Sequence, residues 1–319
     1  MSNKPAGLSN DSLWPRAGGW PSPDDIAPGK RIDAALVGIP ASQTSLSATN
    51  AHETPDAIRA ALYRYSPALM QDRGVLDKNL RNDPAIIDLE ELTVADFGNV
   101  SDPDSPAGEA RTIALMADAA KASELVIALG GDNSITVAAA LGVWGSDLET
   151  AGLITLDAHY DLRDGVSNGS PVRRLIEAGM NPERIVQIGI QDFANSASYA
   201  RRAHELGITV IHRDDLERRS MADVMAEALS IAGSAGGPIH VDLDVDVCDR
   251  AVAPACPASV PGGISAYELR QAARAAGKHS QVHSIDLAEI DATMDAPDGR
   301  TIRLAALCVL EAVAGLSQR

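Results

Sequence analysis

The sequence predicts an α/β protein of three layers, α/β/α, in which helices cover both faces of a mostly parallel central sheet. Short apolar runs typical of buried strands alternate with stretches of helical composition along most of the 319 residues. Strands of a covered parallel sheet are apolar almost throughout, because neither face meets water. Polar or glycine-rich segments follow several of these runs, where such sheets bind ligands. No internal repeat or strong linker divides the chain.

The predicted elements follow one another in regular order. Thr54 is a candidate N-cap and Pro55 suits the first position of a helix. Residues 1–30 are expected to form a loop-like extension before a single domain at 31–319, and residues 77–84 a surface loop. The expected strands are 34–38, 85–88, 93–96, 125–129, 153–156, 185–188, 209–211, 239–247 and 282–287. The expected helices are 55–65, 108–123, 135–143, 172–178, 196–206, 223–232, 266–277 and 303–316.

Composition excludes several classes of function. The formal net charge is -17 and the isoelectric point about 4.7, so a basic nucleic-acid surface is not expected. No apolar run is long enough to span a membrane, and the N-terminus lacks the pattern of a signal peptide. The three cysteines are scattered and predict reduced thiols in a cytoplasmic protein. An acidic enzyme acting on a small molecule is therefore expected.

The segment Asp157-Ala-His159-Tyr-Asp161 directly follows the apolar run 151–156. In an extended chain its two acids and its histidine share one face, and they are donors for a divalent metal. The run 239–247 repeats the pattern with Asp242, Asp244 and Asp246. A turn or a satisfied polar network would explain one such segment, but two strand ends with alternating acids favour a two-metal site.

Four segments resemble signatures of the ureohydrolases, the arginase and agmatinase superfamily. They are Gly-Gly-Asp-Asn-Ser at 130–134, Asp-Ala-His-Tyr-Asp at 157–161, the acidic run 242–249 with the Pro and Gly residues after it, and Asp-Leu-Ala-Glu at 286–289. The resemblance covers residues 34–315 and preserves the order of the motifs. It implies an arginase-like fold and a homo-oligomer, such as the trimers or hexamers that members of the family form.

The resemblance also implies a mechanism with two Mn²⁺ ions and a bridging hydroxide that attacks an amidine or guanidine carbon. Asp157 and Asp244 would bridge both metals. Asp246 would also carry a proton to the leaving amine, and Glu289 would hold the cationic amidinium. The implied metal ligands are Asn133, Asp157, His159, Asp161, Asp244 and Asp246.

Two positions depart from the arginase and agmatinase pattern. Asn133 stands where the family usually has a metal-binding histidine, so the metal site beside it is expected to be weak or empty; alternatively, Asn133 only completes a turn. Asn168 stands where arginases and agmatinases have another histidine. Its presence, and the segment 187–196, resemble the formiminoglutamase branch, which converts N-formimino-L-glutamate to L-glutamate and formamide in histidine degradation.

Such a substrate carries two carboxylates and needs cations near the pocket. Asn168 and Glu289 are candidate substrate contacts, as is Arg173, taken from the arginines at 163, 173 and 174; a solvated surface helix is the alternative for each arginine. His240 lies about 13 Å along the strand from Asp244, too far to share its metals. Two other functions stay open: agmatine or guanidino-acid hydrolysis with release of urea, and a metal-impaired relative that acts as a binding protein.

Overall fold

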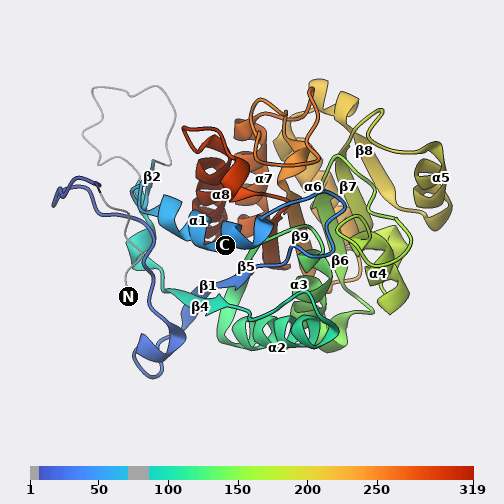
Figure 1. Cartoon of the computed structure of the whole chain (residues 1–319). Helices are drawn as coiled ribbons and strands as arrows, with labels where there is room; N and C mark the ends of the chain where they lie inside the picture. Colours follow the sequence, from blue (N-terminus) through green and yellow to red (C-terminus); the bar gives the residue numbers. More distant parts are fainter. Residues whose placement is uncertain (1–6, 71–85) are drawn as a thin grey trace, which may run out of the picture.

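The computed structural model describes residues 7–70 and 86–319 (Figure 1). Within them, eight parallel strands form one sheet in the order β4-β1-β5-β10-β9-β6-β7-β8. The strands are β1 (Ile32–Ile39), β4 (Val94–Asn99), β5 (Ser123–Gly130), β6 (Gly152–Leu156), β7 (Ile185–Ile190), β8 (Thr209–His212), β9 (Ile239–Asp244) and β10 (Val282–Ala288). β2 (Ala68–Met70) and β3 (Ile86–Asp88) form a separate antiparallel pair.

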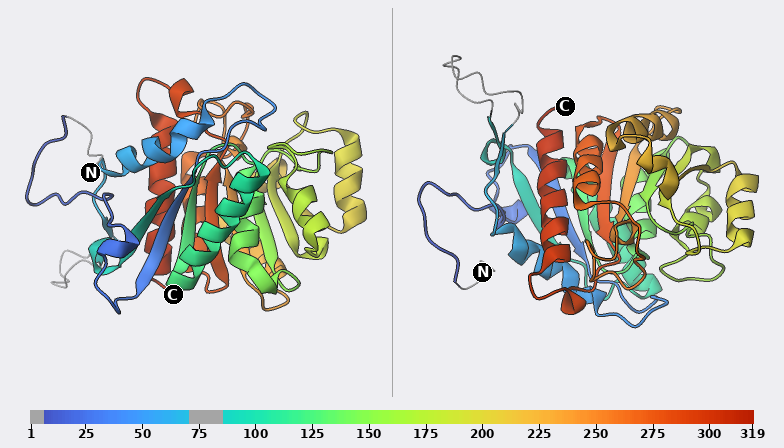
Figure 2. Two further views of the ribbon diagram at one scale, coloured as in Figure 1. Left: turned by 60° about the horizontal axis from the view of Figure 1, so that its bottom comes forward. Right: turned by 90° about the horizontal axis from the view of Figure 1, so that it is seen from above.

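Helices cover both faces of the sheet, as Figure 2 shows from two further sides. One layer contains α2, α3, α4 and α5, with α3 in contact with both α2 and α4, and the other contains α1, α6, α7 and α8 (Figure 2). Their bounds are α1 (Thr54–Leu62), α2 (Pro106–Ala122), α3 (Ile135–Trp144), α4 (Pro171–Ala178), α5 (Ala197–Leu206), α6 (Met221–Ala232), α7 (Ala266–Lys278) and α8 (Arg300–Leu316). The expected three-layer α/β/α fold is confirmed.

Four neighbouring strands place the polar motifs together. β5, β10, β9 and β6 are adjacent in the sheet, and all run in the same direction. The polar segments at 131–134, 157–161, 244–246 and 289 therefore lie at one edge, although they come from distant parts of the sequence. This is the edge at which parallel α/β sheets bind ligands.

The predicted strand 239–247 is wrong in its last part. β9 ends at Asp244, and Val245–Val247 forms a 3-10 turn capped by the Asp244 carboxylate, which accepts a hydrogen bond from the Asp246 amide at 2.9 Å. The extended geometry expected for 157–161 is also wrong, because β6 ends at Leu156 and Asp161 has φ of 52°. Both segments turn over the edge of the sheet, and the turns bring the acids together.

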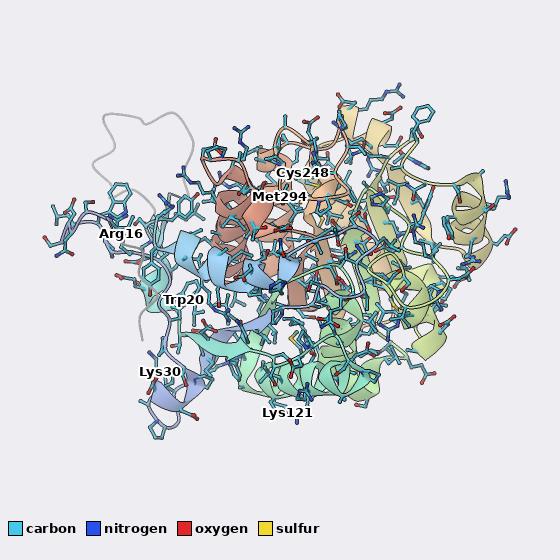
Figure 3. The ribbon with its side chains drawn as sticks, in the orientation of Figure 1. Arg16, Trp20, Lys30, Lys121, Cys248 and Met294 are labelled. Atoms are coloured by element: carbon cyan, nitrogen blue, oxygen red, sulfur yellow. The ribbon has the colours of Figure 1, made fainter. Side chains whose placement is uncertain are left out.

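The remaining elements agree with their predicted positions to within a few residues at each end. The short strand β2 was not predicted. Residues 7–30 contain only a 3-10 turn, Pro23–Asp25, and the predicted loop at 77–84 lies outside the described residues. Figure 3 shows Cys248 in the interior and Lys121 at the periphery. Within the described part of the chain, no helix has the length and apolarity needed to cross a bilayer.

Candidate metal centre

The glycine-rich turn after β5 packs against the loop that follows β1. A Cβ on Gly131 would lie 2.1 Å from the carbonyl oxygen of Ala41, so only glycine fits there. The same carbonyl accepts a hydrogen bond from the Asp132 amide at 2.9 Å. Asp132 in turn accepts a hydrogen bond from the Ser134 amide at 3.1 Å. These contacts hold Asn133 at the edge of the sheet.

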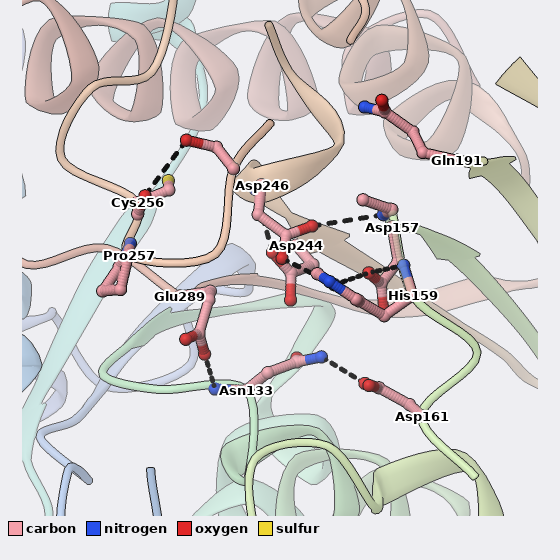
Figure 4. Close-up of polar contacts among 12 residues, drawn as sticks. Asn133, Asp157, His159, Asp161, Gln191, Asp244, Asp246, Cys256, Pro257 and Glu289 are labelled. Carbon is pink, nitrogen blue, oxygen red and sulfur yellow. Dashed lines mark hydrogen bonds and ion pairs between the residues drawn. The ribbon is translucent and has the colours of Figure 1, made fainter. Parts of the chain in front are cut away.

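Asp157, His159 and Asp246 form a compact cluster of metal-ligand type, in which one donor atom from each lies within 4.8 Å of the others (Figure 4). His159 Nδ1 lies 2.9 Å from Asp246 Oδ2 and 3.4 Å from Asp157 Oδ1. Asp246 Oδ1 accepts a hydrogen bond from the Ala158 amide at 3.1 Å, which joins the loops after β6 and β9. Asp157 Oδ2 is buried and has no hydrogen-bond partner in the described part of the chain.

Asp161 and Asp244 lie beside this cluster and line the same pocket. Both carboxyl groups are buried. Burial raises the pKa of Asp161 and of Asp244 well above the usual range, and the nearby acids Asp157 and Asp246 raise them further. Four carboxylates at such close range repel one another unless protons or cations lie between them.

The charges within the cluster are unevenly shared. Burial, followed by the charge of Asp246, raises the pKa of Asp157 from 3.8 to about 6. Burial alone would lower the pKa of His159, but the carboxylates of Asp246 and Asp157 raise it to about 12. Burial also opposes ionisation of Asp246, yet the adjacent imidazole outweighs it and lowers the pKa of that carboxyl. His159 and Asp246 thus form an ion pair. The cost of burying the Asp157 carboxylate is not offset by such a partner, and its pKa is therefore raised.

This donor set fits divalent cations. It combines four carboxyl groups with one imidazole, the set that a hard or borderline ion such as Mn²⁺ prefers over thiolate-seeking metals. The orphaned Asp157 oxygen and the raised pKa values of three acids indicate negative charge that a cation would balance. Three of the six predicted ligands, Asp157, His159 and Asp246, thus form a cluster that could hold a metal, and Asp161 and Asp244 line the pocket beside it.

Asn133, the sixth predicted ligand, is already hydrogen-bonded on both ends of its amide. Its Nδ2 donates to Asp161 Oδ2 at 2.7 Å, and its Oδ1 accepts from the Thr136 hydroxyl at 2.9 Å. The NH₂ group therefore faces the site, whereas a metal would need the oxygen. Its role as a ligand remains a prediction that requires the amide to turn.

Glu289 and Asn168 form a second polar pair at the rim of the cluster. Asn168 Nδ2 donates to Glu289 Oε1 at 2.9 Å and to Oε2 at 3.0 Å. The backbone N–H of Asn133 donates to Glu289 Oε2 at 2.9 Å. Glu289 has φ of 63°, a conformation that non-glycine residues seldom adopt and that is typical of functional sites. Burial raises its pKa to about 7, although the Asn168 hydrogen bonds oppose the rise.

Arg173, predicted to contact substrate, is not among the residues that line this pocket. Its Nε donates to the carbonyl of Arg163 at 2.6 Å, it also donates to the carbonyl of Gly165, and it pairs with Glu177 at 2.5 Å. Since its guanidinium already has these partners at the start of α4, Arg173 instead stabilises the loop that contains Arg163.

Sequence reasoning missed the part that Asn195 plays at the site. Its Oδ1 accepts a hydrogen bond from the Tyr160 amide at 3.1 Å, and its Nδ2 donates to the Ala158 carbonyl at 2.8 Å. Asn195, from the segment after β7, thereby holds the loop that contains Asp157 and His159 in place. No pattern within either segment could have revealed this contact.

His240, excluded as a ligand from its place in the strand, lies in the core beneath the site. Its Nδ1 lies 2.7 Å from the Ser284 hydroxyl and its Nε2 lies 3.1 Å from Asp286 Oδ2. Both neighbours are on β10, the strand beside β9. The histidine is therefore a hydrogen-bonded core residue.

Comparisons with known proteins show which family and which solved structures the chain resembles. Residues 32–315 match the arginase family. A formimidoylglutamase of Halalkalibacterium halodurans is 34% identical over 297 residues, which are 90% of this chain and 88% of that protein. The crystal structure of formimidoylglutamase from Bacillus subtilis has a TM-score of 0.82 and 26% identity, and the match covers 98% of this chain and 95% of that one. Trypanosoma cruzi formiminoglutamase with Mn²⁺ shares the fold, with a TM-score of 0.77 and 22% identity over 90% of this chain and 94% of that one.

Proposed function

Because this chain belongs to the arginase family, we propose that it is a metal-dependent hydrolase of N-formimino-L-glutamate, which yields L-glutamate and formamide. The observation that carries the proposal is the shared pocket, of about 350 Å³, lined both by the metal-ligand acids and by the Asn168–Glu289 pair. Similarity to formimidoylglutamases along nearly the whole chain supports the same substrate.

The residues of the pocket suit the hydrolysis of an amidine. When bound, divalent cations would supply Lewis acidity and a water of lowered pKa as nucleophile. Asp157, His159, Asp161, Asp244 and Asp246 would hold them. Asp246, which pairs with His159, would accept a proton and return it to the nitrogen that leaves as the amine of glutamate. The carbon–nitrogen bond to glutamate breaks, and formamide is the second product.

Glu289 would bind the amidinium of the substrate by charge-assisted hydrogen bonds. Asn168 orients this carboxylate through two hydrogen bonds, at 2.9 and 3.0 Å. An asparagine cannot shuttle a proton near neutral pH, as a histidine can. The pocket is therefore expected to serve an amidine better than a guanidine whose hydrolysis needs such a shuttle.

A product assay tests the proposal. The Mn²⁺-loaded protein is offered N-formimino-L-glutamate, agmatine, arginine and 4-guanidinobutyrate, and formamide, ammonia and urea are measured. We expect formamide from formiminoglutamate and little urea from the other three. A higher kcat/KM for agmatine would overturn the substrate but leave the metal-dependent hydrolase standing. No turnover of any of them, with metal bound, would favour a binding protein.

The proposal includes Mn²⁺ as the metal, with weak binding beside Asn133, and a homo-oligomer formed by one domain at 31–319. It also includes a role in histidine degradation in the cytoplasm, which suits the free, buried cysteines Cys248, Cys256 and Cys308. Metal analysis and light scattering of the purified protein test the metal content and the assembly.

A further inference from the structure

One arginine in the pocket has no partner among the described residues. Arg163 lines the pocket, and its guanidinium makes no hydrogen bond or ion pair with any residue of 7–70 or 86–319. The neighbouring arginines are all engaged. Arg173 binds backbone carbonyls and Glu177, Arg174 binds Glu109, and Arg202 binds Asp164.

Local structure holds Arg163 at the pocket. Its amide donates to the carbonyl of Gly169 at 3.0 Å, and its carbonyl accepts from Arg173 Nε at 2.6 Å. The side chain crosses Gly169 so closely that a Cβ there would lie 2.7 Å from Arg163 Cδ. Because residue 169 is a glycine, the side chain of Arg163 can pass over it toward the pocket. The Arg163 side chain is exposed to solvent, and its backbone hydrogen bonds and the contact with Gly169 keep it at the rim of the pocket.

Among the described residues, basic side chains are few beside the acids of the pocket. The acids Asp161, Asp244, Asp246 and Glu289 line the pocket, and Arg163 and His159 are its only basic side chains among the described residues. His159 pairs with Asp246 and belongs to the metal-ligand cluster. Within residues 7–70 and 86–319, Arg163 is thus the one basic group of the pocket that remains free to meet an anionic part of a ligand. A planar guanidinium is well matched to a carboxylate, which it can bind through two parallel hydrogen bonds.

We propose that Arg163 binds a carboxylate of the substrate and so selects acidic amidines over basic or neutral ones. This inference rests on the proposed function, because it assumes that Glu289 and the metals take the amidine end. The carboxylates of formiminoglutamate are a few bonds from its amidine carbon. A substrate whose amidine met Glu289 would therefore present a carboxylate within the same pocket, which Arg163 also lines. Agmatine instead carries a second cation at that end, which Arg163 would repel.

The test compares two substrates in the Mn²⁺-loaded protein and in Arg163→Met. N-formimino-L-glutamate carries the carboxylates, and formamidine is the same reacting group without them. We expect Arg163→Met to lower kcat/KM for formiminoglutamate roughly tenfold to a hundredfold more than for formamidine, mostly through KM. Arg163→Lys keeps the charge but not the fork, so it should recover part of the loss. Lys121→Met, which removes a charge on the far side of α2, should behave like the parent (Figure 3).

A second measurement separates this inference from the proposed function. Glutarate, a dicarboxylate without an amidine, is titrated calorimetrically into the same four proteins at low and at moderate salt. Binding should weaken in Arg163→Met and depend on salt most strongly in the parent. If the parent turned over neither amidine, the proposed function would fail, and the glutarate titration would still decide the role of Arg163. Equal losses for both substrates, or glutarate binding unaltered by Arg163→Met, would overturn the inference.

Discussion

Removing the metal should leave a protein whose stability falls as the pH rises from 5 to 8. Asp157 is fully buried, and its pKa is raised from 3.8 to about 6. Its folded form therefore binds a proton more tightly than its unfolded form. The stability that this proton provides is complete below pH 3.8 and is lost as the pH rises through about 6.

The magnitude follows from the difference between the two pKa values. A difference of about two corresponds to about 3 kcal/mol, of which roughly half is lost between pH 5 and pH 8. His159, with its pKa raised to about 12, acts in the same direction, because its contribution also declines above its ordinary value of 6.5. The lowered pKa of Asp246 matters only below its ordinary 3.8, outside this range.

The assay is urea unfolding of protein treated with a chelator, set beside the Mn²⁺-loaded protein at each pH. Metal binds the deprotonated carboxylates, so the stabilisation by Mn²⁺ should grow as the pH rises. Asp157→Asn, which cannot ionise, should reduce the pH dependence of the metal-free form and leave the part that His159 contributes through its pairing with Asp246. A metal-free protein whose unfolding free energy stayed constant or increased from pH 5 to 8 would refute this reasoning.

Two further changes test the metal centre itself. Asp157→Ala removes the proposed bridging ligand and should reduce both Mn²⁺ binding and hydrolysis to background; full activity in this variant would exclude the assigned site. Asn133→His replaces an amide bonded to Asp161 and Thr136 with an imidazole, and should tighten the weaker Mn²⁺ site by roughly tenfold or more in a metal titration. Two equally tight sites in the parent protein would contradict the premise of that prediction.

The sequence alone determined the architecture and most of the polar cluster. Strands buried on both faces leave continuous apolar runs, and a parallel sheet places the residues after those runs at one edge. Asp157, His159 and Asp244 could therefore be assigned from local pattern. The resemblance to ureohydrolases added Glu289 and drew attention to Asn133 and Asn168, neither of which any periodicity would single out.

Only the tertiary structure decided how the loops arrange these groups. Asp161 and Asp246 reach the site through turns rather than an extended strand, because their segments are held by contacts with other parts of the chain, such as Ala158 with Asp246. The sequence contains arginines at 163, 173 and 174, and nothing in its pattern shows which of them lines the pocket. Arg173 donates to backbone carbonyls of the loop at 163–165, whereas the side chain of Arg163 lines the pocket. No sequence pattern predicts which of the two arginines lies near those carbonyls. Contacts between segments distant in sequence leave no periodic signal, and only the tertiary structure shows which arginine is bonded within the protein and which lines the pocket.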